Sequence, residues 1–135
     1  LLLNSSLEFA ARAGVHGVHL SSETLSRVTA GEVKAARADS ETGFLVAASC
    51  HDADELGRAV DVGAEFVVLG PVAATRTHPG ATPMGWQRFE ALAREVALPV
   101  FALGGLGEAA IHDAQWHGAQ GVAGIRAFWP AEVSA

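Results

Sequence analysis

The sequence predicts an α/β protein in which parallel strands alternate with helices. Short, continuous apolar runs recur along the chain, and segments with helical spacing of apolar residues lie between most of them. One join recurs three times, at Gly14, Gly63 and Gly118, where a helical pattern ends at the glycine and a strand pattern follows. Successive copies are about two strand–helix units apart, which favours a βα array over segregated strands and helices.

Six strands are predicted because each of these apolar runs is short and uninterrupted, as in a sheet buried on both faces. They are Leu1–Asn4, Gly17–Leu20, Phe44–Ser49, Phe66–Gly70, Val100–Leu103 and Gly121–Ile125.

Four helices are predicted from apolar spacing and from residues that favour helix ends. They are Leu7–Ala13, Asp52–Val62, Gly85–Val96 and Gly107–His117. The last of these is expected to place Ala110, Ile111, Ala114 and Trp116 mostly inward. Residues 24–42 are expected to hold one short helix, around Glu32–Ala38, and a loop.

The number of units bounds the architecture. Six βα units fit an open doubly wound sheet or part of an eight-stranded barrel. A complete barrel usually needs about 250 residues and at least about 200, whereas this chain has 135 and begins directly on a strand. We therefore expect one domain, residues 1–135, that forms about the last six βα units of a TIM (β/α)8 barrel, with the N-terminal units absent from this sequence.

Composition excludes several classes of protein. Half of the residues are apolar and 18% are charged, so the chain is not a disordered tail. The net charge is −6 and the basic residues are scattered, which argues against nucleic-acid and membrane surfaces but allows a small anion site. No apolar run approaches the roughly 20 residues of a membrane span. A single cysteine points to a reducing compartment, and we expect a cytoplasmic protein.

A glycine-rich turn is the first candidate site. Gly104 and Gly105 follow the fifth predicted strand, and Arg126 follows the sixth. Phosphate often binds after the last two strands of a βα barrel, and the bare N–H groups of such a turn can cradle it. The alternative is a tight turn with a surface arginine nearby.

The loop after the fourth predicted strand is a second candidate. It offers the hydroxyls of Thr75 and Thr77, together with Arg76 and His78. Such a loop can close over an anionic ligand, although proline and glycine can also shape an ordinary loop of this kind.

His51 is the candidate for proton transfer, because it follows a predicted strand and imidazole titrates near pH 6.5. The alternative is a solvent-contacting residue at a helix start. Adjacent residues on a strand point to opposite faces, so Cys50 is expected to be a small buried residue rather than a nucleophile paired with His51. No HxxxH, CxxC or HExxH pattern occurs, and no metal site is predicted from the residues.

Taken together, several segments resemble the thiamine-phosphate synthase/TenI superfamily of barrels, in register from residue 1 to about residue 128. They are Leu1–Asn4, Gly17–Leu20, Ser49–His51, Leu69–Val72, Thr75–His78 and Ala102–Leu106. The chain most resembles the C-terminal domain of proteins that fuse an N-terminal Nudix (MutT-like) hydrolase to this barrel, through Ala48–Ala53, Thr77–Ala81 and Trp116–Gly121.

The resemblance implies a synthase that joins a pyrimidine pyrophosphate to a thiazole phosphate, with Mg²⁺ holding the pyrophosphate that leaves. It implies that Gly104, Gly105 and the end of the last strand hold the product phosphate. It also implies that ligand-contacting positions are occupied by Asn4, Ser49, Thr75 and Thr77.

The chain departs from the family at positions that carry charge. Ser5 and Thr24 stand where the resemblance implies aspartates, His78 stands where it implies lysine, and Arg126 where it implies serine. Mg²⁺ prefers carboxylate and phosphate oxygens, so Mg²⁺ is implied by resemblance while its usual ligands are missing. No other cofactor is expected.

Three interpretations stay open. The first is a thiamine-phosphate synthase-like domain of thiamine biosynthesis that binds a thiazole or thiamine phosphate, with catalysis retained or lost. The second is a TenI-type thiazole tautomerase, whose proton-moving histidine His51 matches, or a non-catalytic phosphate-binding module attached to a Nudix hydrolase. The third is a barrel for another sugar or heterocycle phosphate. The expected partners are a small phosphorylated heterocycle, an N-terminal Nudix domain and a second copy of the chain.

Overall fold

A computed structural model describes residues 1–40, 43–75, 80–124 and 127–128. All six predicted strands form, in a sheet whose strand order follows the chain, β1-β2-β3-β4-β5-β6. Within the described residues β1 and β6 are the end strands and the sheet is not closed. This confirms the prediction of successive parallel βα units from a TIM-type barrel. The strands are β1 Leu2–Asn4, β2 Gly17–Leu20, β3 Leu45–Cys50, β4 Phe66–Leu69, β5 Val100–Leu103 and β6 Gly121–Ala123.

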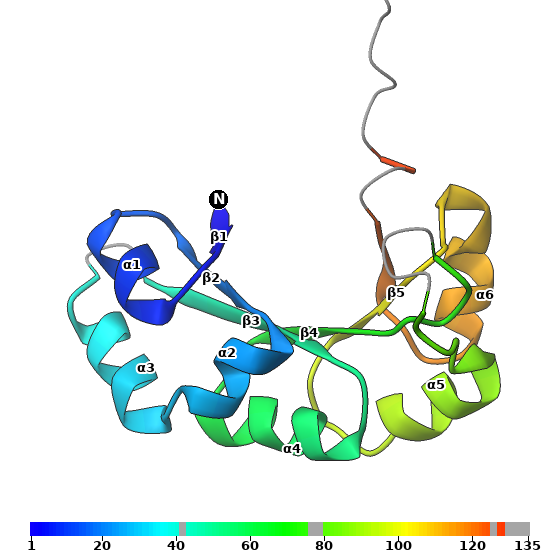
Figure 1. The fold of residues 1–135 in the computed structure, drawn as a ribbon, viewed down its shortest axis with the longest axis horizontal. Coiled ribbons are helices and arrows are strands. Elements are labelled where there is room, and N and C mark those ends of the chain that lie inside the picture. Colours follow the sequence, from blue (N-terminus) through cyan, green and yellow to red (C-terminus); the bar gives the residue numbers. More distant parts are fainter. Residues whose placement is uncertain (41–42, 76–79, 125–126, 129–135) are drawn as a thin grey trace, which may run out of the picture. The chain divides into compact units, whose positions relative to one another are not determined.

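Helices lie between the strands along the chain (Figure 1). None in the described ranges is long and apolar enough to cross a membrane. Their bounds are α1 Leu7–Arg12, α2 Ser22–Arg27, α3 Ala30–Ala38, α4 Ala53–Val62, α5 Gly85–Ala93, the 3-10 turn Glu108–Ala110 and α6 Ile111–Trp116.

Helix α2 lies where the sequence analysis expected a loop. The Ser21 hydroxyl accepts a hydrogen bond from the backbone N–H of Thr24 and begins the helix. Val28 is extended, and Thr29 then begins α3 with a reciprocal capping box to Glu32. Two short helices separated by extended residues blur the 3.6-residue periodicity, so the pattern predicted only the second of them.

The described chain divides into two compact units. The first comprises Leu1–Val68 and Val96–Pro99, and the second comprises Leu69–Glu95 and Val100–Ala135.

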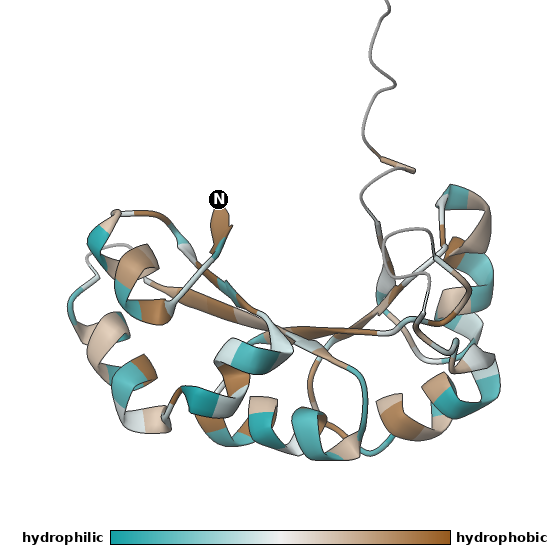
Figure 2. Ribbon diagram, in the orientation of Figure 1, coloured by the Kyte–Doolittle hydropathy of each residue, from teal (hydrophilic) through white to brown (hydrophobic). Residues whose placement is uncertain are grey.

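In the first unit, helices cover one face of the parallel strands β1, β2 and β3. Helix α1 packs on β2, while α2 and α4 pack on β3. The face toward the helices is almost fully buried and entirely apolar; it carries Val18, Leu20, Val46, Ala48 and Cys50. In Figure 2 strand β3 is mostly brown, whereas the helices alternate between brown and teal, as one buried face requires.

The opposite face of the same strands carries polar residues. Asn4 lies beside His19, and His19 lies beside Ala47, in the parallel register. Ser49 follows Ala47 by two positions and therefore lies on this face as well. The face is polar at the ends where the strands finish, which is where chemistry collects in βα barrels.

In the second unit, β5 pairs with β6 in parallel and α6 packs on β6. Phe89 of α5 is fully buried. The rings of Trp86 and Phe89 meet edge to face, with their centroids 5.7 Å apart. The Trp86 ring also stacks on that of His117, with a centroid distance of 5.1 Å.

Ile111, which was expected to lie inward, is 37% exposed, and the prediction that Trp116 lies inward is wrong. Its side chain is 79% exposed, whereas Ala114 on the same helix is fully buried. Two helical positions correspond to a rotation of about 200°, so these residues occupy opposite faces. Because the small Ala114 takes the inward position on α6, Trp116 is left on the outside.

Candidate functional site

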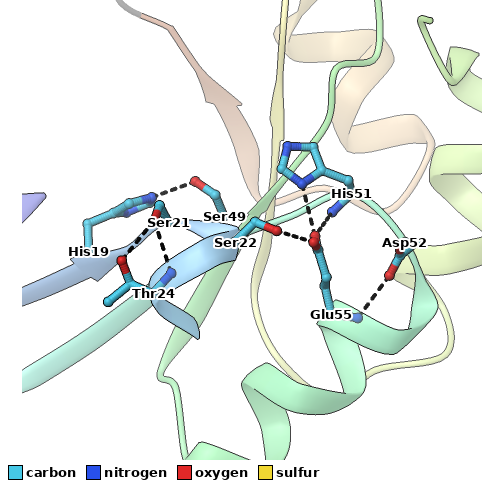
Figure 3. Close-up of polar contacts among 8 residues, drawn as sticks. All are labelled: His19, Ser21, Ser22, Thr24, Ser49, His51, Asp52 and Glu55. Atoms are coloured by element: carbon cyan, nitrogen blue, oxygen red, sulfur yellow. Dashed lines mark hydrogen bonds and ion pairs between the residues drawn. The ribbon is translucent and has the colours of Figure 1, made fainter. Parts of the chain in front are cut away.

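The strand ends of the first unit place a histidine beside a serine. His19 Nε2 and Ser49 Oγ are joined by a 2.7 Å hydrogen bond between β2 and β3 (Figure 3). Burial lowers the pKa of His19 from its ordinary value, which favours the neutral imidazole. Asn4 lies next to His19 in the register and is exposed. Ser49 and Asn4, both predicted site residues, therefore border the same neutral histidine.

Sequence analysis did not identify His19 as a site residue. Its position in β2 could have indicated it. His19 is one residue before the end of the strand, and it faces the side of the sheet opposite to the buried Val18 and Leu20. Its partner Ser49 is 30 residues away in the chain, so only the strand register brings the two together.

His51 lies just beyond β3, in contact with a carboxylate. Its backbone N–H donates to Glu55 Oε2 over 2.7 Å, and its ring nitrogen Nδ1 is 2.9 Å from the same oxygen. The hydroxyl of Ser22, on α2, donates to the other carboxylate oxygen, Oε1. Figure 3 shows Glu55 between Ser22 and His51. The predicted proton-transfer residue thus belongs to a network drawn from three segments.

The local sequence explains how Glu55 reaches His51. Asp52 is the N-cap of α4, and its carboxylate accepts a hydrogen bond from the backbone N–H of Glu55. This contact, made over 2.9 Å, holds Glu55 in the first helical turn, one turn beyond His51. From that position the Glu55 side chain extends back toward the residue before the cap.

Cys50 is buried, as predicted. Desolvation, followed by the negative charges of Glu55 and Asp52, raises the pKa of its thiol to about 12. A thiol with so high a pKa supplies almost no thiolate at neutral pH, so Cys50 packs as a small apolar residue and does not act as a nucleophile.

In the second unit, the glycine turn after β5 packs tightly against the loop after β4. A Cβ on Gly104 would lie 2.6 Å from Pro71 Cα, and one on Gly105 would lie 2.4 Å from the carbonyl oxygen of Ala74. Both glycines also have positive φ angles, +103° and +66°. The turn therefore needs glycine at both positions, for conformation and for space.

The same contact positions Thr75. The backbone N–H of Val72 donates to the Leu103 carbonyl over 2.8 Å, and that of Ala73 donates to the Gly104 carbonyl over 3.1 Å. These bonds hold the segment that leads into Thr75 beside the turn. Within the described residues, no hydrogen bond is recorded from the backbone N–H groups of Gly105 and Leu106.

The predicted site residues divide between the units. Asn4, Ser49 and His51 belong to the first, and Thr75, Gly104 and Gly105 to the second. The remaining predicted positions, Thr77, His78 and Arg126, lie outside the described residues.

The residues present do not fit the Mg²⁺ that the resemblance implies. The Thr24 hydroxyl bonds to the Ser21 hydroxyl at 2.8 Å, inside the cap of α2. The neighbouring carboxylate of Glu23 pairs with Arg27 at 2.7 Å on a largely exposed surface and does not replace the missing aspartate. In the ranges that the structure describes, no cluster of three acidic, histidine or cysteine side chains is suited to a metal. We therefore derive no step that uses the ion.

The fold is an open parallel sheet of successive βα units of the TIM-barrel type, with polar groups after several of its strands. A family model described as "Thiamine monophosphate synthase" matches residues 1–128. The chain belongs to this family, which confirms the resemblance to the thiamine-phosphate synthase/TenI superfamily.

Named relatives agree with the family model. The chain is 38% identical over 129 residues to a putative thiamine-phosphate synthase of Geobacter sulfurreducens, covering 95% of this chain and 58% of the relative. It is 31% identical over 128 residues to the putative thiamine-phosphate synthase 2 of Aquifex aeolicus, covering 95% of this chain and 65% of the relative. The chain thus spans about three fifths of the length of these relatives.

A solved structure shows the same fold. The thiamine phosphate pyrophosphorylase of Pyrococcus furiosus superposes with a TM-score of 0.73 at 23% identity. The match covers 97% of this chain and 59% of that one. At this identity the likeness concerns the architecture alone.

Proposed function

We propose that the chain is a thiamine-phosphate synthase-like domain of thiamine biosynthesis that binds a thiazole phosphate or thiamine phosphate. The observation that carries this proposal is the glycine turn at Gly104 and Gly105, in a chain of the thiamine monophosphate synthase family. Its backbone N–H donors at Gly105 and Leu106 have no recorded partner among the described residues. Phosphate oxygens accept hydrogen bonds from such bare amides after a barrel strand.

Other predicted residues complete the proposed ligand site. Thr75 adjoins the glycine turn, and Thr77, His78 and Arg126 supply further donors or positive charge in this proposal. By the family resemblance, Asn4 and Ser49 of the first unit are also ligand-contacting positions. With a net charge of −6, the chain attracts a phosphate through such local donors rather than through its overall field.

We further propose that the domain binds its ligand without Mg²⁺ and is degenerate as a synthase. Departure of pyrophosphate develops negative charge that Mg²⁺ and basic groups ordinarily stabilise. Ser5 and Thr24 replace the carboxylates that the family resemblance implies for the ion, and Thr24 is engaged in a helix cap. Neither hydroxyl supplies the charge that holds a divalent cation.

A second function, thiazole tautomerisation, is favoured by the contact between His51 and Glu55. This reaction needs a phosphate anchor and a group that moves a proton, but no leaving group or metal. The His51 side chain is about half exposed and its Nδ1 lies 2.9 Å from a carboxylate oxygen. A half-exposed imidazole beside a carboxylate is a suitable proton carrier.

We also propose that an N-terminal Nudix hydrolase precedes this barrel in the full-length protein, that two copies associate and that the protein works in the cytoplasm. The support for the fusion is the resemblance of the segments Ala48–Ala53 and Trp116–Gly121 to those proteins. A phosphate-binding barrel attached to a hydrolase would hold the phosphorylated heterocycle without converting it.

Calorimetry on the full-length protein tests the proposed function. We expect thiazole phosphate and thiamine phosphate to bind with the same affinity whether or not Mg²⁺ and pyrophosphate are present. Arg126→Ala should weaken the binding of both ligands, while the control Arg12→Ala, at an exposed arginine, should leave both affinities unchanged. An affinity that rises with Mg²⁺ and pyrophosphate would overturn the degenerate assignment, and lack of binding by either ligand would overturn the domain's proposed role.

A further inference from the structure

The first unit has a hollow at the ends where its strands begin. The hollow has a volume of about 620 Å³ and is lined by His16, Arg37, Gly43, Phe44, Leu45 and Glu65. All six residues belong to the first unit. We propose that this hollow binds a small zwitterionic amino acid with an apolar side chain. The site is separate from the phosphate site proposed above and does not depend on it.

The hollow lies away from the polar strand ends. His16 directly precedes β2, Phe44 directly precedes β3 and Glu65 directly precedes β4. His19 and Ser49 lie near the opposite ends of β2 and β3. A ligand in the hollow therefore meets a different set of side chains from a ligand at the strand ends.

An anchored ion pair provides both signs of charge at the hollow. Arg37, in the last turn of α3, pairs with Glu65. Its Nε donates to the Phe44 carbonyl over 3.3 Å, and its Nη2 donates to the Gly63 carbonyl over 2.6 Å. Glu65 Oε2 in turn accepts from the backbone N–H of Val46 over 2.6 Å. Backbone contacts thus hold both charged groups in place before a ligand arrives, which lowers the entropic cost of binding.

Both charged groups keep capacity for further hydrogen bonds. A guanidinium carries five N–H donors, and a carboxylate has about four lone-pair positions. Contacts within the described residues use three of those donors on Arg37 and two of those positions on Glu65. The two side chains are 34% and 37% exposed, so both are accessible to a ligand.

The charge of the pair selects the class of ligand. Arg37 and Glu65 together carry no net charge, so a simple anion is repelled by the carboxylate and a simple cation by the guanidinium. A zwitterionic amino acid matches both, because its carboxylate accepts from Arg37 while its ammonium group donates to Glu65. The two groups of the amino acid are attached to one carbon, so they lie close together, as the two side chains of the ion pair do.

Leu45 supplies apolar surface for the side chain of the ligand. It is 46% exposed at the start of β3 and lines the hollow, whereas Phe44 beside it is almost fully buried. Covering Leu45 removes apolar surface from water, which favours an aliphatic or aromatic amino acid over glycine or a charged one. The volume of about 620 Å³ lies within the range of roughly 300–1,000 Å³ found for small-molecule sites.

A purely structural ion pair leads to a different expectation. Arg37 and Glu65 also join the end of α3 to the residue before β4, which stabilises the fold with or without a ligand. Such a contact would show no preference among small molecules. A preference for ligands that carry both charges separates the two roles, and it can be measured on the unaltered protein.

The first experiment follows the Val46 amide by ¹H–¹⁵N NMR of the full-length protein, because this N–H donates directly to Glu65. L-Phenylalanine is compared with 3-phenylpropionate, which lacks the ammonium group, and with 2-phenylethylamine, which lacks the carboxylate. We expect a saturable shift with phenylalanine and a Kd at least about 10-fold higher for each of the other two. An equal Kd for either analogue, or no saturable shift with phenylalanine or L-leucine, would overturn the proposal.

The second experiment measures the Kd of phenylalanine for variants of the hollow. Glu65→Gln keeps an oxygen that accepts the backbone hydrogen bond but removes the charge, and Leu45→Thr removes apolar surface while keeping a residue that favours strands. We expect each to raise the Kd by about 5-fold or more. The matched controls are Glu8→Gln, at an exposed ion pair on α1, and Val60→Thr, at an equally exposed position on α4; both should bind as the wild type does. An unchanged Kd in both Glu65→Gln and Leu45→Thr would exclude the hollow as the site.

Discussion

Two histidines near the ends of β2 and β3 show how the surroundings of a side chain decide its chemistry. His19 is partly buried and bonded to Ser49, and burial lowers its pKa. His51 is half exposed and meets a carboxylate. The first is suited to hold a ligand as a neutral hydrogen-bonding group, and the second to carry a proton.

The lowered pKa of His19 predicts a pH-dependent stability. Unfolded histidine titrates near pH 6.5, while the folded His19 titrates lower. The unfolded state therefore binds a proton first, and the stability present above about pH 6.5 is lost as pH falls through the folded pKa. Urea unfolding between pH 7.5 and 5 should show a smaller loss for His19→Gln than for wild type. Exposed His112→Gln should follow the wild type, and parallel profiles for all three would contradict the prediction.

The buried thiol of Cys50 predicts slow chemical modification. With a pKa of about 12, it supplies less than about 0.1% thiolate at pH 8. A thiol reagent such as dithiobis-nitrobenzoate should therefore label native protein slowly and denatured protein quickly. Cys50 is the single cysteine of the chain, so the signal is unambiguous. Rapid, complete labelling of the native protein would show the prediction to be wrong.

At the scale of elements, the helices depend on their end residues. Helix α3 begins with the capping box between Thr29 and Glu32, whose hydrogen bonds lower the pKa of Glu32. Helix α4 ends at Gly63, in the left-handed conformation at φ +81°. Helices of six to ten residues are too short to be stable alone, so these ends and the packing against the sheet sustain them.

Removal of the α3 cap should weaken the fold. Thr29→Ala deletes the hydroxyl that accepts from the Glu32 backbone N–H, and we expect the free energy of unfolding to fall by about 1 kcal/mol. Ser26→Ala removes a hydroxyl that bonds inside α2 without capping it, and should stay within about 0.5 kcal/mol of wild type. Chemical denaturation of both variants checks the difference. Equal losses would contradict a capping role for Thr29.

Alanine at two glycines, Gly57 inside α4 and Gly63 at its end, should change the free energy of unfolding in opposite directions. Gly63→Ala forces a side chain into the left-handed region and should cost about 1–2 kcal/mol. Gly57 lies inside α4 with no atom within 4 Å of an added Cβ, so Gly57→Ala should gain about 0.5–1 kcal/mol. Their midpoints in urea should move to opposite sides of the wild type. A gain for Gly63→Ala would refute the conformational argument.

At the scale of the whole molecule, successive βα units bring residues from distant parts of the sequence to the ends of the strands. The first unit gathers Asn4, His19 and Ser49 from three consecutive strands or strand ends. The second joins the glycine turn after β5 to the loop after β4 through paired backbone bonds. Parallel strands make such gatherings possible, because their carboxyl ends share one edge of a sheet.

A ligand that binds the folded protein should stabilise it as a whole. At a thiazole phosphate concentration of 100 times its Kd, we expect a gain of about 2.7 kcal/mol and a rise in Tm that grows with concentration. Gly105→Ala should abolish the rise, because its Cβ would lie 2.4 Å from the Ala74 carbonyl oxygen. Gly57→Ala serves as the matched control and should retain it. A ligand-dependent rise in Gly105→Ala equal to that of wild type would exclude the glycine turn as the phosphate site.

Local patterns sufficed for much of the fold. All six strands, the left-handed end of α4 at Gly63 and the burial of Cys50 could be predicted from the sequence. Each depends on apolar runs, caps or alternation within a few residues. The strand pattern also indicated His51, which follows a strand, as a candidate, whereas Ser49 and Asn4 became candidates through the family resemblance.

Only the tertiary structure decided which of those groups meet. The bond of His19 to Ser49 joins residues 30 apart in the sequence, and that of Ser22 to Glu55 joins residues 33 apart. The tight contact of Gly105 with Ala74 and the outward position of Trp116 are also tertiary. The physical reason is that local sequence sets backbone preference and periodicity over a few residues, whereas side-chain partners follow from strand register and helix packing. The sequence by itself determined a thiamine-phosphate synthase-like array of βα units. The packing of α4 against the end of β3 placed the Glu55 carboxylate beside His51, the candidate for proton transfer.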